Sequence, residues 1–207
     1  MNLFLIRHGR SLANEQKLVT GNTADVLSPE GVSQVEDLKV WLNNIGVVAD
    51  QYITSQWQRA QQTANILRSA EKWVVTTEVG ETDAGEVNEW KLCDFLLQYP
   101  DFYQSPKTCY PGGESHNQLY NRTTHWLNNL LKNSAVHENV MLVAHSGPIS
   151  CLLQRVANVS MDSFPAFSPS NASLSIINFV DNDIDKGSIM GVSLCSEKMI
   201  AKQLGLS

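Results

Sequence analysis

Two runs of consecutive apolar residues mark the centre of a predicted sheet. Leu3 to Ile6 and Val140 to Ala144 contain no polar residue, which is the pattern of strands covered on both faces in a parallel sheet. The first run ends at Arg7-His8-Gly9 and the second at His145-Ser146-Gly147. Because open α/β sheets bind ligands at the carboxyl ends of their strands, we expect both histidines to face one crevice.

Segments with helical periodicity alternate along the chain with the two apolar strands and with shorter predicted strands. Ser28 and Pro29 are an N-cap and a first helical residue, and apolar residues then recur at helical spacing up to Gly46. The alternation predicts an α/β fold, a three-layer α/β/α sandwich with a mostly parallel sheet. The other predicted helices lie near 57–67, 119–131 and 148–156, and the other predicted strands near 51–54, 73–77, 172–180 and 188–194.

The periodicity weakens between residues 78 and 118. Asp83, Gly85, Pro100, Pro106 and the run Pro111-Gly112-Gly113 predict loops around one short helix near 90–98. Long irregular insertions in compact domains are commonly lids or substrate-facing segments. We therefore expect a single domain over residues 1–207 with a small helical and loop cap insertion at about 78–118.

Composition narrows the possible partners. The 207 residues are 43% hydrophobic, enough for a full core, and the net charge of −6 includes no run of lysine or arginine. We expect no nucleic-acid partner and no membrane partner, and an anionic ligand would need individually placed cations. The four cysteines are spread without metal-binding spacing, which predicts reduced thiols in a cytoplasmic protein without a metal or other cofactor.

The residues beside the two histidines point toward a site. A histidine on a buried strand is, taken alone, more often a core residue than a catalyst. Arg7, however, places a guanidinium at the edge of an apolar core, where a charge is costly unless an anion or carboxylate compensates it.

Residues 6–14, IRHGRSLAN, resemble the signature of the histidine phosphatase superfamily, the phosphoglycerate mutase-like family. Five further landmarks of that family follow in order along the chain. They are Thr20-Gly21 followed by Asp25, Leu27, Ser28 and Gly31; SQWQRAQQT at 55–63; ETDAGE at 81–86; PGGES at 111–115 with Arg122; and VAHSG at 143–147.

The resemblance implies that His8 carries a phosphoryl group, that Arg7 and Arg59 bind it, and that Glu81 is the general acid. Guanidinium forks suit the three equatorial oxygens of a transferring phosphoryl group. His8 has to be neutral, so its second ring nitrogen should be fixed by a backbone carbonyl near Gly9 or on the second strand. His145, if protonated in the complex, would add a donor.

The resemblance places four more residues at the substrate: Asn14, the backbone of Thr20 and Gly21, and Ser146. Glu86 and Glu89 compete with Glu81 for the acid role. We expect Arg122 to pair with Glu114, and His116, His125 and His137 to be surface or interhelical residues. The five tryptophans are expected to serve packing, with Trp90 a candidate for the mouth of the site.

The sequence departs from the family pattern in three places. Arg10 stands where a carboxylate or amide is usual, and Ser146 stands where glycine is commoner. Between them, Gly85-Glu86 is followed by Val87 to Trp90 without the family's second glycine. Arg10 and the altered segment after Gly85 leave the shape of the cap and the substrate preference open.

The expected function is metal-independent hydrolysis of a small phosphorylated metabolite. A cofactor-dependent phosphoglycerate mutase and an inactive module that binds phosphorylated ligands are the alternatives. The sequence does not define the oligomeric state, for which a dimer is one candidate.

Overall fold

The computed structural model describes residues 1–19 and 22–196. One six-stranded sheet has the strand order β3-β2-β4-β1-β5-β6. The first four strands of this order run parallel, β5 runs antiparallel to β1, and β6 runs antiparallel to β5. The predicted, mostly parallel sheet is therefore confirmed. Its strands are β1 Asn2–Arg7, β2 Gln51–Ser55, β3 Trp73–Thr76, β4 Asn139–Ala144, β5 Leu174–Phe179 and β6 Gly187–Leu194.

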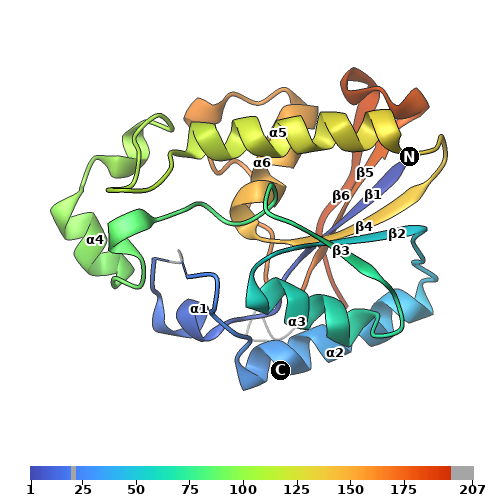
Figure 1. Ribbon diagram of the computed structural model, residues 1–207, viewed down its shortest axis with the longest axis horizontal. Helices are drawn as coiled ribbons and strands as arrows, with labels where there is room; N and C mark the ends of the chain where they lie inside the picture. The colour runs from blue at the N-terminus through green and yellow to red at the C-terminus, as the bar shows by residue number, and fades with distance from the viewer. Residues whose placement is uncertain (20–21, 197–207) are drawn as a thin grey trace.

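Helices cover both faces of the sheet, as the predicted three-layer sandwich requires. In Figure 1, α5 lies above the sheet with α6 beside it, and α2 and α3 lie below. These helices are α2 Pro29–Asn44, α3 Gln58–Leu67, α5 His116–Asn133 and α6 Ser146–Ala157.

Alternate side chains of the central strands separate two cores. Leu3 and Leu5 of β1 pack with α5 and α6, whereas Ile6 packs with α2 and α3, and all three side chains are 0% exposed. Each such side chain contributes roughly 1.5–3 kcal/mol on full burial. This two-sided burial is why the strands read as unbroken apolar runs.

The chain leaving β1 is clamped against the start of α2. Ser28 caps that helix, since its Oγ accepts a hydrogen bond from the amide of Gly31 at 3.1 Å. Gly31 must lack a side chain because a Cβ atom there would overlap the carbonyl of Arg10. The close approach fixes the backbone next to His8.

The segment between β3 and α5 has a small core of its own. Phe95, Phe102 and Tyr110 pack together there with Val19, which lies in the segment between β1 and α2. The amide of Leu92 donates to the carbonyl of Lys17 at 3.0 Å, which joins the segment to that loop. We call residues 78–115 the cap, because α5 begins at His116 with Ser115 as its N-cap.

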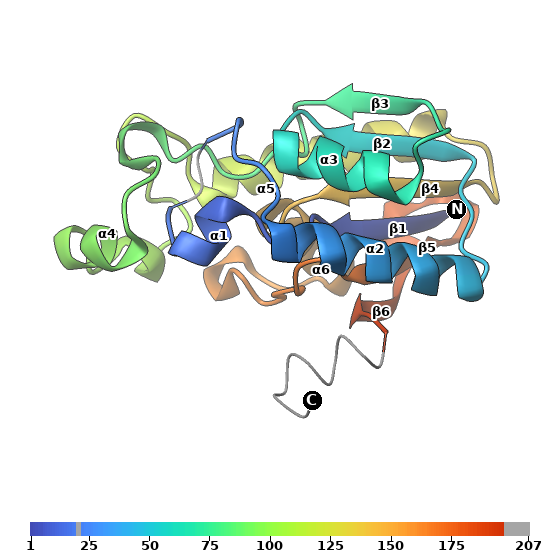
Figure 2. The ribbon, with the colours of Figure 1, turned by 90° about the horizontal axis from the view of Figure 1, so that it is seen from below.

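The cap lies at the carboxyl ends of the parallel strands. Figure 2 shows the arrows of β1, β2 and β3 pointing toward the side of the molecule where α1 and α4 lie. Helix α4, Leu92–Gln98, matches the short helix predicted in the cap. Helix α1, Leu12–Gln16, was not predicted, since five residues are too few to show a helical period.

Candidate active site

The pairing of β1 with β4 brings the two strand-end histidines together. The amide of His8 donates to the carbonyl of Ala144 at 3.0 Å. The rings of His8 and His145 meet edge to face with centroids 5.0 Å apart, and both side chains are buried. The two imidazoles therefore lie together, covered by other residues, at the carboxyl ends of these strands.

Hydrogen bonds define which nitrogen of His8 carries the proton. Nδ1 lies 2.6 Å from the carbonyl oxygen of Gly9, to which it can only donate, and Nε2 accepts from Nε of Arg59 at 3.0 Å. Burial, then Arg59 and then Arg7, hold the pKa of His8 well below its usual 6.5. The ring is therefore neutral, with its lone pair on Nε2.

Arg59 is a fully buried cation with compensating partners. Its Nη1 lies 2.9 Å from the carboxylate of Asp25, in an ion pair of which both side chains are buried. The guanidinium carbon also lies 4.4 Å from the ring centre of Trp57. Burial lowers the pKa of Arg59, while Glu81 and Asp25 favour its charge.

Arg7 is the less compensated of the two arginines. Its Nη1 donates to the carbonyl of Pro169 at 2.6 Å, and its buried Nε has no hydrogen-bond partner within residues 1–19 and 22–196. No ion pair involves Arg7 in that part of the chain. Its pKa is lowered chiefly by burial, and Glu81 acts in the opposite direction. An anion in the crevice would satisfy this guanidinium.

His145 offers a donor without being protonated. Its Nε2 lies 2.7 Å from Oγ of Ser55, which already accepts a hydrogen bond from the amide of Trp57. Nδ1 is buried and has no partner among the described residues. In the tautomer that carries its proton on Nδ1, Nε2 accepts from the Ser55 hydroxyl and the Nδ1–H group is left to donate to a ligand. Burial and then Arg59 hold the pKa of His145 well below 6.5, so the ring is neutral.

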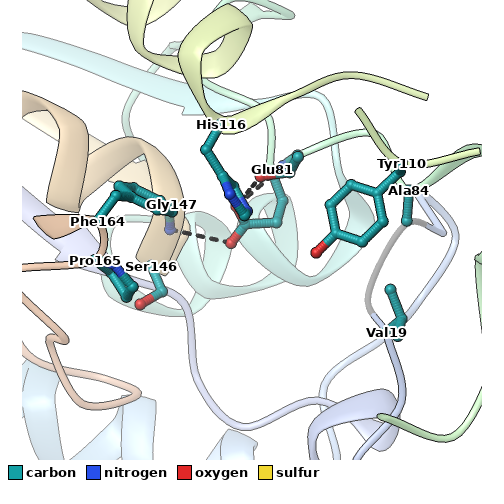
Figure 3. Close-up of a pocket in the computed structure, with 10 residues that line it drawn as sticks. Val19, Glu81, Ala84, Tyr110, His116, Ser146, Gly147, Phe164 and Pro165 are labelled. Carbon is teal, nitrogen blue, oxygen red and sulfur yellow. Dashed lines mark hydrogen bonds between the residues drawn. The ribbon is translucent and has the colours of Figure 1, made fainter. Parts of the chain in front are cut away.

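Glu81 belongs to the cap, and its carboxylate lies close enough to Arg7 and Arg59 to favour their charged forms. Its carboxylate accepts hydrogen bonds from the amide of Gly147 at 3.2 Å and from that of Thr82 at 3.0 Å. Figure 3 shows the first of these bonds, which joins the cap to the start of α6. Gly147 permits this approach because a Cβ atom at that position would overlap the carboxylate of Glu81.

The predicted pair of Arg122 and Glu114 is present and supports the backbone of Glu81. The two side chains form an ion pair at 2.6 Å. Arg122 also donates to the carbonyls of Glu78 at 2.8 Å and Glu81 at 2.9 Å. The competing carboxylates Glu86 and Glu89 are exposed.

Of the four residues expected around the substrate, the structure describes two, and they lie in different hollows. Oδ1 of Asn14 accepts from the amide of Ser11 and from Nδ2 of Asn171, and Asn14 lines the same hollow as Arg7. Ser146 is the first residue of α6 and lines the cavity beside Glu81. Thr20 and Gly21 lie outside the described residues.

Several supporting residues had no role in the sequence-based prediction. Thr63 accepts from the amide of Gly9 at 3.1 Å and so holds the carbonyl that orients His8. Asn171 donates to the carbonyl of His8 at 3.1 Å. Asp25 and Thr63 belong to the quoted landmarks, which could have marked them, but nothing in the pattern around Asn171 distinguishes it.

One expectation changes in the structure. His116 was expected at the surface or between helices, but it is 6% exposed and lines the cavity that contains Glu81. Trp90 packs on the core of the cap. Arg10, the unusual cation after the R-H-G triplet, pairs with Glu30 at 3.0 Å.

Within residues 1–19 and 22–196, no group of three or more histidine, cysteine, aspartate or glutamate residues is arranged to hold a metal ion. No helix in the same ranges is both long and apolar enough to cross a membrane.

Comparison with known proteins defines the protein family to which the chain belongs. A model of the histidine phosphatase superfamily (branch 1) matches residues 3–187. The chain therefore belongs to the histidine phosphatase superfamily, as its six landmarks indicated.

The relatives include mutases and phosphatases. A probable phosphoglycerate mutase of Proteus mirabilis, GpmB, is 28% identical over 163 residues, which cover 75% of this chain and 74% of that protein. The adenosylcobalamin/α-ribazole phosphatase of Escherichia coli is 26% identical over 164 residues, 75% of this chain and 79% of that protein. The structure of a mycobacterial glucosyl-3-phosphoglycerate phosphatase shares the fold, with a TM-score of 0.82 and 21% identity over 94% of this chain and 99% of that chain.

The buried histidines predict a loss of stability in mild acid. The pKa values of His8, His145 and His116 are lowered by burial from an ordinary 6.5, so the unfolded chain binds these protons at a higher pH than the folded chain. Their contribution is complete above pH 6.5 and falls below it, by up to about 1.4 kcal/mol per pH unit for each histidine. Between pH 7.5 and pH 5.0, the free energy of unfolding measured in urea should fall less for His8→Gln than for the natural chain. An equal fall in both proteins would contradict the lowered pKa of His8.

Proposed function

We propose that the protein is a phosphomonoester hydrolase that acts through a phosphohistidine at Nε2 of His8. One observation carries the proposal: a neutral imidazole with its lone pair on Nε2 lies against one buried guanidinium and close to a second that lacks an ion-pair partner among the described residues. A dianionic phosphate supplies the missing charge and the electrophile together.

In the first step, Nε2 of His8 attacks phosphorus and the bond to the ester oxygen breaks. Glu81, in its protonated form, gives its proton to the leaving oxygen. The guanidinium groups of Arg7 and Arg59 and the Nδ1 proton of His145 bind the equatorial oxygens. The hydrogen bond from Arg59 to His8 is exchanged for one to phosphate, which releases the lone pair for attack.

In the second step, water attacks the phosphorus of the phosphohistidine. Glu81, now a carboxylate, accepts the proton of that water. The P–N bond breaks, its electron pair returns to Nε2, and inorganic phosphate leaves. The two arginines supply the charge stabilisation in both steps, so the proposed mechanism assigns no step to a metal ion.

Removal of the nucleophile should abolish turnover. We expect His8→Ala to lower kcat for an aryl phosphate by at least about 1000-fold, measured with a chelator present, because no other group takes over the attack. His125→Ala, a change of an exposed histidine on α5, is the matched control and should keep the natural rate. Full activity of His8→Ala, or a strict need for an added divalent metal, would contradict the mechanism.

The acid assignment predicts a dependence on the leaving group. Glu81→Gln should lower the first-turnover rate for an alkyl phosphate by about 100-fold or more, since the alkoxide needs a proton. With 4-nitrophenyl phosphate the first turnover should be much less affected, and slow hydrolysis of phosphohistidine should then produce a burst of 4-nitrophenolate. Glu86→Gln is the control and should show neither effect. An equal loss in first turnover on both esters would exclude Glu81 as the acid.

Phosphoglycerate mutase activity is the second candidate because GpmB is among the relatives. Glu81 lines two hollows. The described lining residues of one include neither lysine nor arginine, and in the other Arg122 is already paired with Glu114, so both favour hydrolysis. We expect 3-phosphoglycerate, if it is turned over, to yield inorganic phosphate rather than 2-phosphoglycerate. Net formation of 2-phosphoglycerate in the presence of a bisphosphoglycerate primer would instead establish the mutase.

A further inference from the structure

A cavity of about 160 Å³ opens directly beside the carboxylate of Glu81. In Figure 3, Tyr110 and His116 stand on one side of this space and Phe164 and Pro165 on another, with Ser146 and Gly147 at the start of α6. Glu81 also lines a second hollow, in which Arg122 is already paired with Glu114. Since Glu81 is the proposed donor to the leaving oxygen, a group attached to that oxygen would lie beside its carboxylate, and the aromatic cavity is the place that we assign to this group.

Aromatic rings form much of its wall. The ring of His116 packs against that of Phe164 with centroids 4.6 Å apart and an interplanar angle of 32°. Tyr110 stands nearly perpendicular to His116 at 5.9 Å. Val19 and Ala84 add apolar surface. These flat and apolar side chains come from the loop between α1 and α2, the cap, α5 and the chain after α6, and they suit a flat apolar group.

The polar groups of the cavity do not carry positive charge at neutral pH. Burial lowers the pKa of His116, so its imidazole is neutral there. Burial raises the pKa of Tyr110, so its hydroxyl keeps its proton. Lysine and arginine are absent from the described lining residues, and Glu81 is the carboxyl group among them. A carboxylate on the substrate would enter without a counterion, at a cost of desolvation.

We propose that this cavity selects phosphate esters of small uncharged alcohols that carry an aromatic or flat apolar group, and that it disfavours carboxylated alcohols. The inference rests on the proposed function, because it takes Glu81 as the group at the leaving oxygen. The size agrees with the proposal, since an apolar cavity of about 150 Å³ accepts a benzene molecule. Phe164 is the specificity-determining residue, and it is only partly buried, so substitution there spares the core.

Three esters of primary alcohols test the selection with similar leaving-group chemistry. We expect kcat/KM to fall from benzyl phosphate to glycerol 3-phosphate and again to 3-phosphoglycerate, with at least about a tenfold difference between the first and the last. Equal values for the three, or a preference for 3-phosphoglycerate, would overturn the proposal.

Substitutions at Phe164 test the role of the cavity wall. Phe164→Ala should raise KM for benzyl phosphate about tenfold and change kcat/KM for glycerol 3-phosphate less than about threefold. Phe164→Arg should raise kcat/KM for 3-phosphoglycerate relative to benzyl phosphate by providing a counterion. Leu97→Ala, at an 82% exposed cap residue on α4, is the matched control and should alter none of these ratios. If both Phe164 variants lowered kcat/KM by the same factor for all three esters, the proposed selection by the cavity wall would be contradicted.

Binding separates this inference from the proposed function. Calorimetry with His8→Ala, which lacks the nucleophile, should show tighter binding of benzyl phosphate than of 3-phosphoglycerate. That preference without turnover of any ester by the natural chain would overturn the proposed hydrolysis and support the cavity assignment. Turnover without the preference would leave hydrolysis standing and overturn the cavity assignment.

Discussion

The site depends on two guanidinium groups, one fully and one partly buried, beside two neutral imidazoles. Burying a charge costs several kcal/mol, and the fold offsets this for Arg59 with the carboxylate of Asp25 and the ring of Trp57. Arg7 receives a carbonyl oxygen but no ion-pair partner among the described residues. The same positive charges and the same burial lower the pKa of His8 and keep its ring neutral. The proposed anion affinity and the proposed activation of the nucleophile therefore have one physical origin.

Backbone contacts make that arrangement rigid. The parallel pairing of β1 with β4 sets the two histidines side by side, and Thr63 holds Gly9 so that its carbonyl orients His8. The proposed acid is held by a different part of the chain, since Arg122 fixes the backbone of Glu81 and the start of α6 binds its carboxylate. The strand ends thus supply the proposed phosphoryl chemistry, and the cap and the chain after α6 supply the surface that meets the alcohol.

The sequence was most informative where one physical signal dominated. Unbroken apolar runs predicted β1 and β4, and Ser28 with Pro29 predicted the start of α2, because burial on two faces and helix capping leave local patterns. The cavity role of His116 could not be predicted, since it arises when the cap folds back against the chain after α6. Asn171 lies 163 residues from His8 along the chain, and only the pairing of β5 with β1 brings its segment close. The contact between His145 and Ser55 also required the structure, because the two residues lie at the ends of different strands, 90 residues apart along the chain.

Chemical trapping of the phosphoenzyme tests the central claim most directly. The Glu81→Gln variant, in which the second step is slowed, would be mixed with 4-nitrophenyl phosphate and quenched in alkali, where phosphohistidine survives. Peptide mapping by mass spectrometry should then locate a single phosphoryl group on His8, and the double variant His8→Ala with Glu81→Gln should carry none. A phosphoryl group on another residue, or turnover by the natural chain with no phosphoenzyme at any time point, would contradict the account.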